Sequence, residues 1–288
     1  MKLDGRRESS NVEDRRGMSG AGKAGVGLGG VAIIAIITLL MGGNLGDVFQ
    51  NVVQSGGLTQ ATESSYEPTA ENEALAKFSR QILASTEDVW SQYFRKMGLG
   101  TYKNPTLVLY TGATSTACGT GQAAMGPFYC SADECVYLDL EFFTEMKKSI
   151  GADGDFAYAY VIAHEVGHHV QHLLGTLDEA HSAMSRASEK DRNQISVRLE
   201  LQADYYAGVW GYHENQMFGS LESGDIEEAV NAAGKIGDDY LQKKGRGYSV
   251  PDSFTHGTSA QRTKWLKKGL QTGDVNGGDT FSSSYNSL

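Results

Sequence analysis

The residues His164-Glu165-Val166-Gly167-His168 lie inside an apolar, helix-forming segment. Residues four apart share one face of a helix, so the imidazoles of His164 and His168 can reach one metal ion, with Glu165 beside them as a base. With seven histidines in 288 residues, a chance match to His-Glu-x-x-His is expected only ~0.01 times per chain. Two ordinary structural histidines are the alternative, and the surrounding sequence argues against them.

The segment from Asp155 to Leu174 has the periodicity of a helix with one buried face. We expect Asp153 or Asp155 to cap its start and Gly175 to end it. Gly167 costs about 1 kcal/mol relative to alanine inside a helix, which suggests that close backbone packing requires it. The apolar face consists of Ala159, Ile162, Ala163, Val166, Val170 and Leu173, whereas His164, Glu165, His168 and His172 lie on the other side.

Two histidines leave zinc short of a protein ligand, so another part of the chain must supply one. The metzincin extension of the motif requires glycine and histidine where this chain has Gln171 and Leu174, which excludes that class. A second helix is predicted over residues 197–210, and Glu200 and Asp204 share one of its faces. We expect Glu200 to be the third ligand and Asp204 to orient a ligand imidazole through its far ring nitrogen. The reverse assignment, with Asp204 on the metal, remains open.

Other histidines compete as ligands. His172, His181 and His213 are candidates, but none occurs in a pattern that also supplies a supporting carboxylate. We therefore interpret them as structural or surface residues, with His172 the nearest rival because it shares the ligand side of its helix.

A polar segment over residues 252–262 ends in a helix start that Thr258 or Ser259 can cap. His256 or Arg262 could point from this segment into the cleft and stabilise the oxyanion formed when water attacks a carbonyl. An ordinary loop with a helix cap explains the same residues equally well.

Several quoted elements together resemble one family. They are Gly5-Arg6-Arg7, Asn11-Val12-Glu13-Asp14-Arg15-Arg16, Met125-Gly126-Pro127-Phe128-Tyr129-Cys130, the HEVGH helix, Glu200-Leu201-Gln202-Ala203-Asp204 and Phe254-Thr255-His256-Gly257-Thr258. The chain resembles, over nearly its whole length, the bacterial membrane-anchored neutral zinc metallopeptidases. Its Glu-x-x-Ala-Asp and Thr-His elements are also similar to those of integral-membrane gluzincins. The resemblance implies that Glu200 binds zinc and that His256 lies near the active site, and it implies no particular substrate.

We predict an α+β fold, in which a zincin-like metallopeptidase domain over residues 73–271 is mainly helical with a small mixed sheet. It should begin with a helix over residues 73–97 and contain strands at residues 106–110 and 135–140. In such an arrangement an edge strand can align an extended peptide. The polar residues 46–72 are predicted to form a flexible linker, and residues 272–288 a disordered tail.

A single transmembrane helix is expected over residues 24–45, which carry no charge and include a dense apolar run at residues 31–41. Six basic residues precede it: Lys2, Arg6, Arg7, Arg15, Arg16 and Lys23. The positive-inside rule therefore places residues 1–23 in the cytoplasm and the catalytic domain in the periplasm or outside the cell, anchored in the bacterial inner membrane. A cleaved signal peptide is the alternative, although no small-x-small site follows Met41.

The net charge bears on the binding partners, and the cysteines bear on disulfide formation. A net charge of −10 and a pI near 5.2, without a basic patch, argue against a nucleic-acid partner. Three cysteines, Cys118, Cys130 and Cys135, cluster in one region, and oxidation outside the membrane would pair two of them. We predict a disulfide between Cys118 and Cys130.

The sequence therefore predicts a zinc-dependent peptidase with one Zn²⁺ per chain, which hydrolyses extracytoplasmic proteins or peptides with Glu165 as general base. One rival is an envelope scaffold or binding protein whose zinc site is catalytically silent. Another is a non-peptide amidase such as a deformylase, in which Cys130 or Cys135 replaces Glu200 on the metal.

Overall fold

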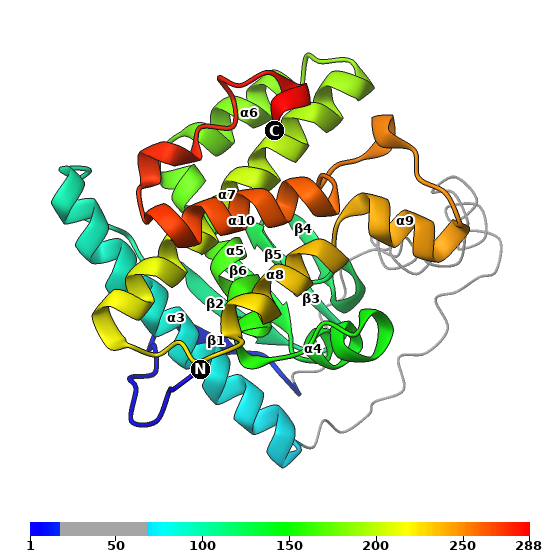
Figure 1. The fold of residues 1–288 in the computed structure, drawn as a ribbon. Coiled ribbons are helices and arrows are strands. Elements are labelled where there is room, and N and C mark those ends of the chain that lie inside the picture. Colours follow the sequence, from blue (N-terminus) through cyan, green and yellow to red (C-terminus); the bar gives the residue numbers. More distant parts are fainter. Residues whose placement is uncertain (18–67) are drawn as a thin grey trace.

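The structure, a computed structural model, describes residues 1–17 and 68–288, which fold as helices around a small sheet (Figure 1). The strands are β1 (Val12–Asp14), β2 (Thr106–Tyr110), β3 (Ala113–Thr116), β4 (Gly119–Gln122), β5 (Phe128–Cys130) and β6 (Cys135–Asp139). The helices are α3 (Ala70–Met97), α4 (Glu141–Glu145), α5 (Asp155–Leu173), α6 (Thr176–Met184), α7 (Glu189–Phe218), α8 (Asp225–Lys235), α9 (Asp238–Arg246) and α10 (Ser259–Thr272). The chain is thus an α+β protein, mainly helical with a small mixed sheet.

The main sheet has the strand order β1-β2-β6-β5, in which β5 is antiparallel to β6 and the other neighbours are parallel. Successive side chains of a strand point to opposite faces. Leu107, Leu109, Val136 and Leu138 therefore join the large core with α3 and α5, whereas Val108, Tyr110 and Tyr137 form a smaller cluster on the other face. The order leaves β5 at the sheet edge nearest the helix that carries the His-Glu-x-x-His motif.

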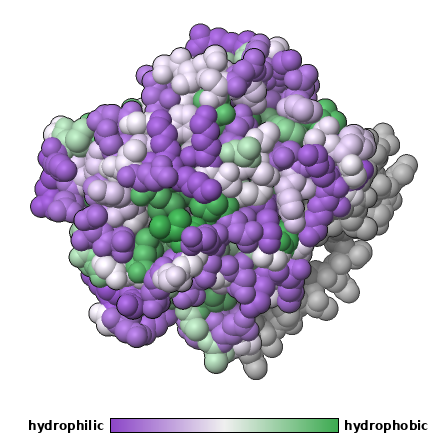
Figure 2. Space-filling view, viewed as in Figure 1, coloured by the Kyte–Doolittle hydropathy of each residue, from purple (hydrophilic) through white to green (hydrophobic). Residues whose placement is uncertain are grey.

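The long helix α7 packs against α5 on one side and α10 on the other. Gly208 of α7 meets Gly269 of α10, where a Cβ atom added to Gly269 would lie 2.1 Å from the carbonyl oxygen of Tyr205. These glycines allow the two backbones to touch. The face of the molecule that Figure 2 shows is largely hydrophilic, and apolar residues gather in a patch near its centre.

Helix α5 begins and ends where the sequence predicts, but the hydrogen-bond acceptor at its first turn is not the predicted one. The backbone N–H of Phe156 donates to Glu228 of α8 at 3.2 Å, and neither Asp153 nor Asp155 caps the helix. A side chain distant in sequence thus does the work expected of a local cap.

Residues 1–17 belong to the same folded unit as the helices that follow. Strand β1 pairs in parallel with β2, and Val12 lies opposite Leu107. Arg6 binds the fully buried carboxylate of Glu214 at 2.8 Å, and Arg7 binds the buried Glu87 at 2.9 Å. The expectation that residues 1–23 lie across a membrane from the catalytic domain is therefore wrong for residues 1–17, because neighbouring strands of one sheet share one compartment.

The expected transmembrane helix at residues 24–45 lies outside the described residues. Within residues 1–17 and 68–288, no helix combines the length and the apolar character needed to cross a membrane.

Two predicted boundaries are also corrected. Helix α3 starts at Ala70, with Thr69 as its N-cap, so the last residues of the expected linker 46–72 are helical. Residues 272–288, expected to be disordered, pack on the domain instead: Val275 is buried, and the Thr280 hydroxyl donates to the carbonyl of Arg198 at 2.7 Å. The polar composition of this tail concealed the hydrogen bonds that hold it.

The predicted disulfide between Cys118 and Cys130 is confirmed. It ties the turn of the β3–β4 hairpin to the end of β5, where Cys130 lies opposite Cys135 of β6. Cys135 is a buried free thiol.

Candidate metal centre

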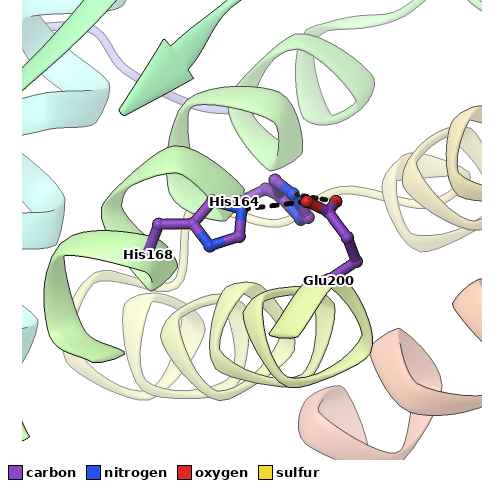
Figure 3. A group of neighbouring side chains, drawn as sticks. All are labelled: His164, His168 and Glu200. Atoms are coloured by element: carbon purple, nitrogen blue, oxygen red, sulfur yellow. Dashed lines mark hydrogen bonds and ion pairs between the residues drawn. The ribbon is translucent and has the colours of Figure 1, made fainter. Parts of the chain in front are cut away.

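Helices α5 and α7 bring three possible metal ligands together (Figure 3). His164 and His168 project from α5 toward the carboxylate of Glu200 on α7. The Nε2 atom of His164 is 3.2 Å from Glu200 Oε2, and the Nε2 atom of His168 is 3.5 Å from Oε1. One ligand atom from each residue lies within 4.8 Å of the other two. This group matches the three residues predicted from the sequence.

Asp204 holds His164 from behind. Its Oδ1 atom lies 2.8 Å from His164 Nδ1. A carboxylate at neutral pH only accepts hydrogen bonds, so His164 carries a proton on Nδ1, and Nε2 is the ring nitrogen that faces Glu200. Arg262 donates to both oxygens of Asp204 at 2.8 and 2.9 Å, and the Tyr160 hydroxyl donates to Oδ1 at 2.5 Å. Asp204 therefore supports a ligand, and the reverse assignment with Asp204 on the metal is not what the geometry shows.

Arg262 has a different place from the one considered in the sequence. It is only 3% exposed and lies behind His164, bound to Asp204. Burial opposes its charge, but the carboxylates of Asp204 and Glu200 raise its pKa well above the usual range. Arg262 thus neutralises the buried carboxylate of Asp204.

Glu165 is adjacent to both imidazoles and is 8% exposed. Burial raises its pKa, which His164 and His168 partly counteract. A buried carboxylate with a raised pKa beside a metal site has the properties of a proton acceptor and donor.

His164 and Glu200 shift each other's pKa. Burial disfavours the charged form of His164, but Asp204 and Glu200 outweigh this effect and raise its pKa to about 10. Burial likewise works against the charge of Glu200, yet its contacts with His164 and His168 lower its pKa well below the usual range. A carboxylate fixed between two imidazoles is a binding site for a cation, and two nitrogens with one oxygen are a donor set that zinc prefers.

His256 comes from the loop before α10 and is held by Asp238. Its Nδ1 atom lies 3.3 Å from Asp238 Oδ1, while Oδ2 accepts the backbone N–H groups of Thr255, His256 and Gly257. The surrounding protein opposes a charge on His256, but Asp238 and Glu200 raise its pKa to about 8. The side chain is 53% exposed. His256 is therefore an accessible imidazole that feels the charge of Glu200.

Gly167 lies at the closest contact between α5 and α7. A Cβ atom added to Gly167 would lie 2.9 Å from the carbonyl oxygen of Ala203 and 3.1 Å from its Cα atom. The predicted close packing beneath the motif is confirmed. It fixes the spacing between the helix that carries the histidines and the helix that carries Glu200.

None of the rival ligands joins this group among the described residues. His172 lies 3.4 Å from Asp178, His213 binds the carbonyl of Gly273 at 2.8 Å, and His181 is exposed. Cys130 is in the disulfide, and the Cys135 thiol donates to the carbonyl of Asp133. The deformylase-like arrangement with a sulfur ligand is therefore excluded.

Sequence reasoning missed residues that reach the site from a distance. Tyr160, Asp238 and Gln171 carry no motif, although Gln171 occupies the position three residues after the second histidine. His169 was also missed: the Tyr129 hydroxyl of β5 donates to its Nδ1 at 2.9 Å, and its Nε2 donates to the carbonyl of Lys103 at 2.7 Å. These bonds fasten α5 to the sheet edge.

Comparisons with known proteins agree with this geometry. The family model described as "Putative neutral zinc metallopeptidase" matches residues 1–281. The chain is similar to the uncharacterized protein YpfJ of Escherichia coli K12, with 50% identity over 99% of this chain and 100% of that protein. It is also similar to the uncharacterized protein Mb2605 of Mycobacterium bovis, with 40% identity over 69% of this chain and 68% of that protein. No solved structure matches significantly.

Proposed function

The chain belongs to the neutral zinc metallopeptidase family, and on that premise we propose that it is a zinc-dependent peptidase that hydrolyses peptide bonds with Glu165 as general base. The observation that carries the proposal is the meeting of His164, His168 and Glu200 at one point, with their donor atoms within 4.8 Å of one another.

These three residues would hold the zinc ion. Zinc bound there supplies a Lewis acid that lowers the pKa of a water molecule toward about 7 and polarises a carbonyl group. Asp204 keeps a proton on His164 Nδ1, so Nε2 is the nitrogen that would lose its proton and bind the metal.

Glu165 and His256 share the remaining chemistry. Glu165 takes the proton of the attacking water, and its raised pKa lets it pass that proton to the leaving amine. His256, held by Asp238, donates a hydrogen bond to the oxygen of the carbonyl as negative charge develops on it.

We propose that an extended peptide binds along the β5 edge of the sheet. Strand β5 is the last strand in the order β1-β2-β6-β5, and Tyr129 in β5 is hydrogen-bonded to His169, the neighbour of His168. An edge strand this close to the motif helix suits peptide binding by main-chain hydrogen bonds. We therefore propose peptides or proteins with an accessible extended segment as substrates.

We also propose that the catalytic domain lies outside the bacterial cytoplasmic membrane. The disulfide between Cys118 and Cys130 supports this location, because such bonds persist in oxidising compartments. Residues 1–17 are then on the same outer side, because β1 belongs to the sheet of the domain.

The test combines metal analysis with a peptide-library cleavage assay. The wild-type chain should bind one zinc ion and cleave peptides, whereas Glu165→Gln should bind zinc equally and lose turnover. Glu227→Gln, an exposed glutamate on α8, is the matched control and should cleave normally. A zinc-loaded wild-type protein that cleaves nothing would favour the silent scaffold, and an active Glu165→Gln variant would overturn the mechanism.

A further inference from the structure

His168, the second histidine of the metal group, has a hydrogen-bond partner on its far ring nitrogen that no sequence motif predicts. Gln171 lies one turn after His168 on α5 and is fully buried. Its Oε1 atom is 2.8 Å from His168 Nδ1. Its Nε2 atom donates to the carbonyl of Leu199 at 2.8 Å and to Oε1 of Gln202 at 3.0 Å. Gln171 thus joins one ligand to the backbone immediately before another, because Leu199 precedes Glu200.

The direction of the Gln171 amide is fixed by its partners. A backbone carbonyl only accepts hydrogen bonds, so the amide nitrogen must face Leu199 and the amide oxygen must face His168. An oxygen in that position requires a proton on His168 Nδ1. The His168 Nε2 atom, 3.5 Å from Glu200 Oε1, is then the ring nitrogen left to bind a metal.

Gln202 fixes the same direction from the other end. Its Nε2 atom donates to the carbonyl of Gly278 at 2.9 Å, so its Oε1 atom must face Gln171. Gly278 ends the short 3-10 helix Val275–Gly278 in the C-terminal segment. The chain of bonds therefore runs from the tail through two buried glutamines to the metal centre.

We propose that Gln171 is a positioning residue for His168, and that Leu199, Gln202 and the tail fix the direction of its amide. The inference rests on the proposed zinc site and adds the residues that prepare one of its ligands. A ligand imidazole held in one tautomer and one rotamer needs less rearrangement to bind a metal, and loss of such a partner typically weakens metal binding 10- to 100-fold.

The experiment measures zinc affinity by competition with a chelator, and ligand geometry from the absorption of the cobalt(II)-substituted protein. Gln171→Leu should bind zinc about 10- to 100-fold more weakly than wild type and give a changed cobalt spectrum. Gln171→Glu keeps an acceptor for His168 and loses both donors, so it should recover most of the zinc affinity while remaining less stable.

The matched control is Gln242→Leu. Gln242 is also a buried glutamine, with hydrogen bonds to Val250 and Ser253 outside the metal centre. It should lose stability and keep the zinc affinity of wild type. If Gln171 has only a structural role, Gln171→Leu should likewise lose stability and keep the zinc affinity of wild type. That result would overturn the inference.

A further measurement needs no variant, in case Gln171→Leu does not fold. Nitrogen-15 spectra of the zinc-free wild-type protein should show a proton on His168 Nδ1, whereas an Nδ1 atom without a proton would overturn the inference. Failure of the proposed function looks different: a wild-type chain that binds no zinc removes the site and this inference with it. If the wild-type chain binds zinc and Gln171→Leu binds it with equal affinity, only the inference about Gln171 fails.

Discussion

Arg262 donates two hydrogen bonds to Asp204, from Nε to Oδ2 at 2.8 Å and from Nη2 to Oδ1 at 2.9 Å. The pair is almost completely buried, and Asp204 uses Oδ1 again to hold His164 at 2.8 Å. Burial opposes the charge of Asp204, but Arg262 and His164 outweigh it and keep the pKa of this carboxyl below its usual value. The charge that orients a ligand therefore depends on a residue 58 positions further along the chain.

Arg262→Met should destabilise the protein by about 3–5 kcal/mol, because it leaves the buried carboxylate of Asp204 without its cation. Chemical denaturation of the zinc-free protein measures this loss. Adding Asp204→Met should restore much of the stability, since two apolar side chains then replace the pair. Zinc affinity should remain low in the double variant, because His164 has lost its partner. A double variant that binds zinc like wild type would contradict the role of Asp204.

Gly167→Ala should separate α5 from α7. The added methyl group would lie 2.9 Å from the carbonyl oxygen of Ala203, which is backbone and cannot rotate away. We expect a loss of about 1–3 kcal/mol in stability and weaker zinc binding, because Glu200 moves with α7. Gly234→Ala on α8 is the control: its nearest contact is the Thr263 methyl group at 3.4 Å, so it should stabilise by up to about 1 kcal/mol. Equal effects at both positions would show that close packing at Gly167 is unimportant.

The sequence predicted the parts of the site that follow helical spacing. His164 with His168, and Glu200 with Asp204, are each four residues apart, so one helix places each pair without help from the rest of the fold. The strand at residues 106–110 and the disulfide were likewise readable from local pattern. Tertiary contacts decided the rest. Arg262 and Asp238 act through partners on other elements, and no spacing rule links them to the motif.

The N-terminal segment shows why counting basic residues gave a wrong prediction of membrane topology. Arg6 and Arg7 counted as cytoplasmic markers under the positive-inside rule. In the structure they neutralise the buried carboxylates of Glu214 and Glu87. Sequence alone cannot show that a basic residue is already paired within the fold.

The two described parts of the chain should therefore lie on one side of the membrane. Ser10→Cys reports on the N-terminal segment and Lys267→Cys on the domain, and both positions are exposed. A membrane-impermeant maleimide applied to intact, outer-membrane-permeabilised cells should label both alike, and we expect both to be labelled. The parent chain is the background, because its one free thiol, among the described residues, is buried. Labelling of Lys267→Cys alone would restore the single-pass arrangement and contradict the packing of β1.

Stability should fall in mild acid because of His169. Its side chain is fully buried, and burial lowers its pKa to about 4 from 6.5, although its bond to the Lys103 carbonyl acts in the opposite direction. Above pH 6.5 the residue is neutral in both the folded and the unfolded chain, so its contribution is fully present. As the pH falls from 6.5 toward 4, the unfolded chain takes up a proton that the folded chain refuses. The free energy of unfolding should drop by about 1.4 kcal/mol per pH unit, about 3 kcal/mol in total.

His169→Gln isolates this contribution, because glutamine can still donate to the Lys103 carbonyl but does not titrate. The variant should be less stable than wild type at pH 7.5, and the difference should shrink steadily toward pH 4 as wild type loses its advantage. Denaturation curves of both zinc-free proteins at several pH values measure the difference, in which the titration of other buried groups cancels. A difference that stays constant from pH 7.5 to 4 would show that His169 accepts a proton in the folded protein, and that its bonds to Tyr129 and Lys103 do not hold it neutral.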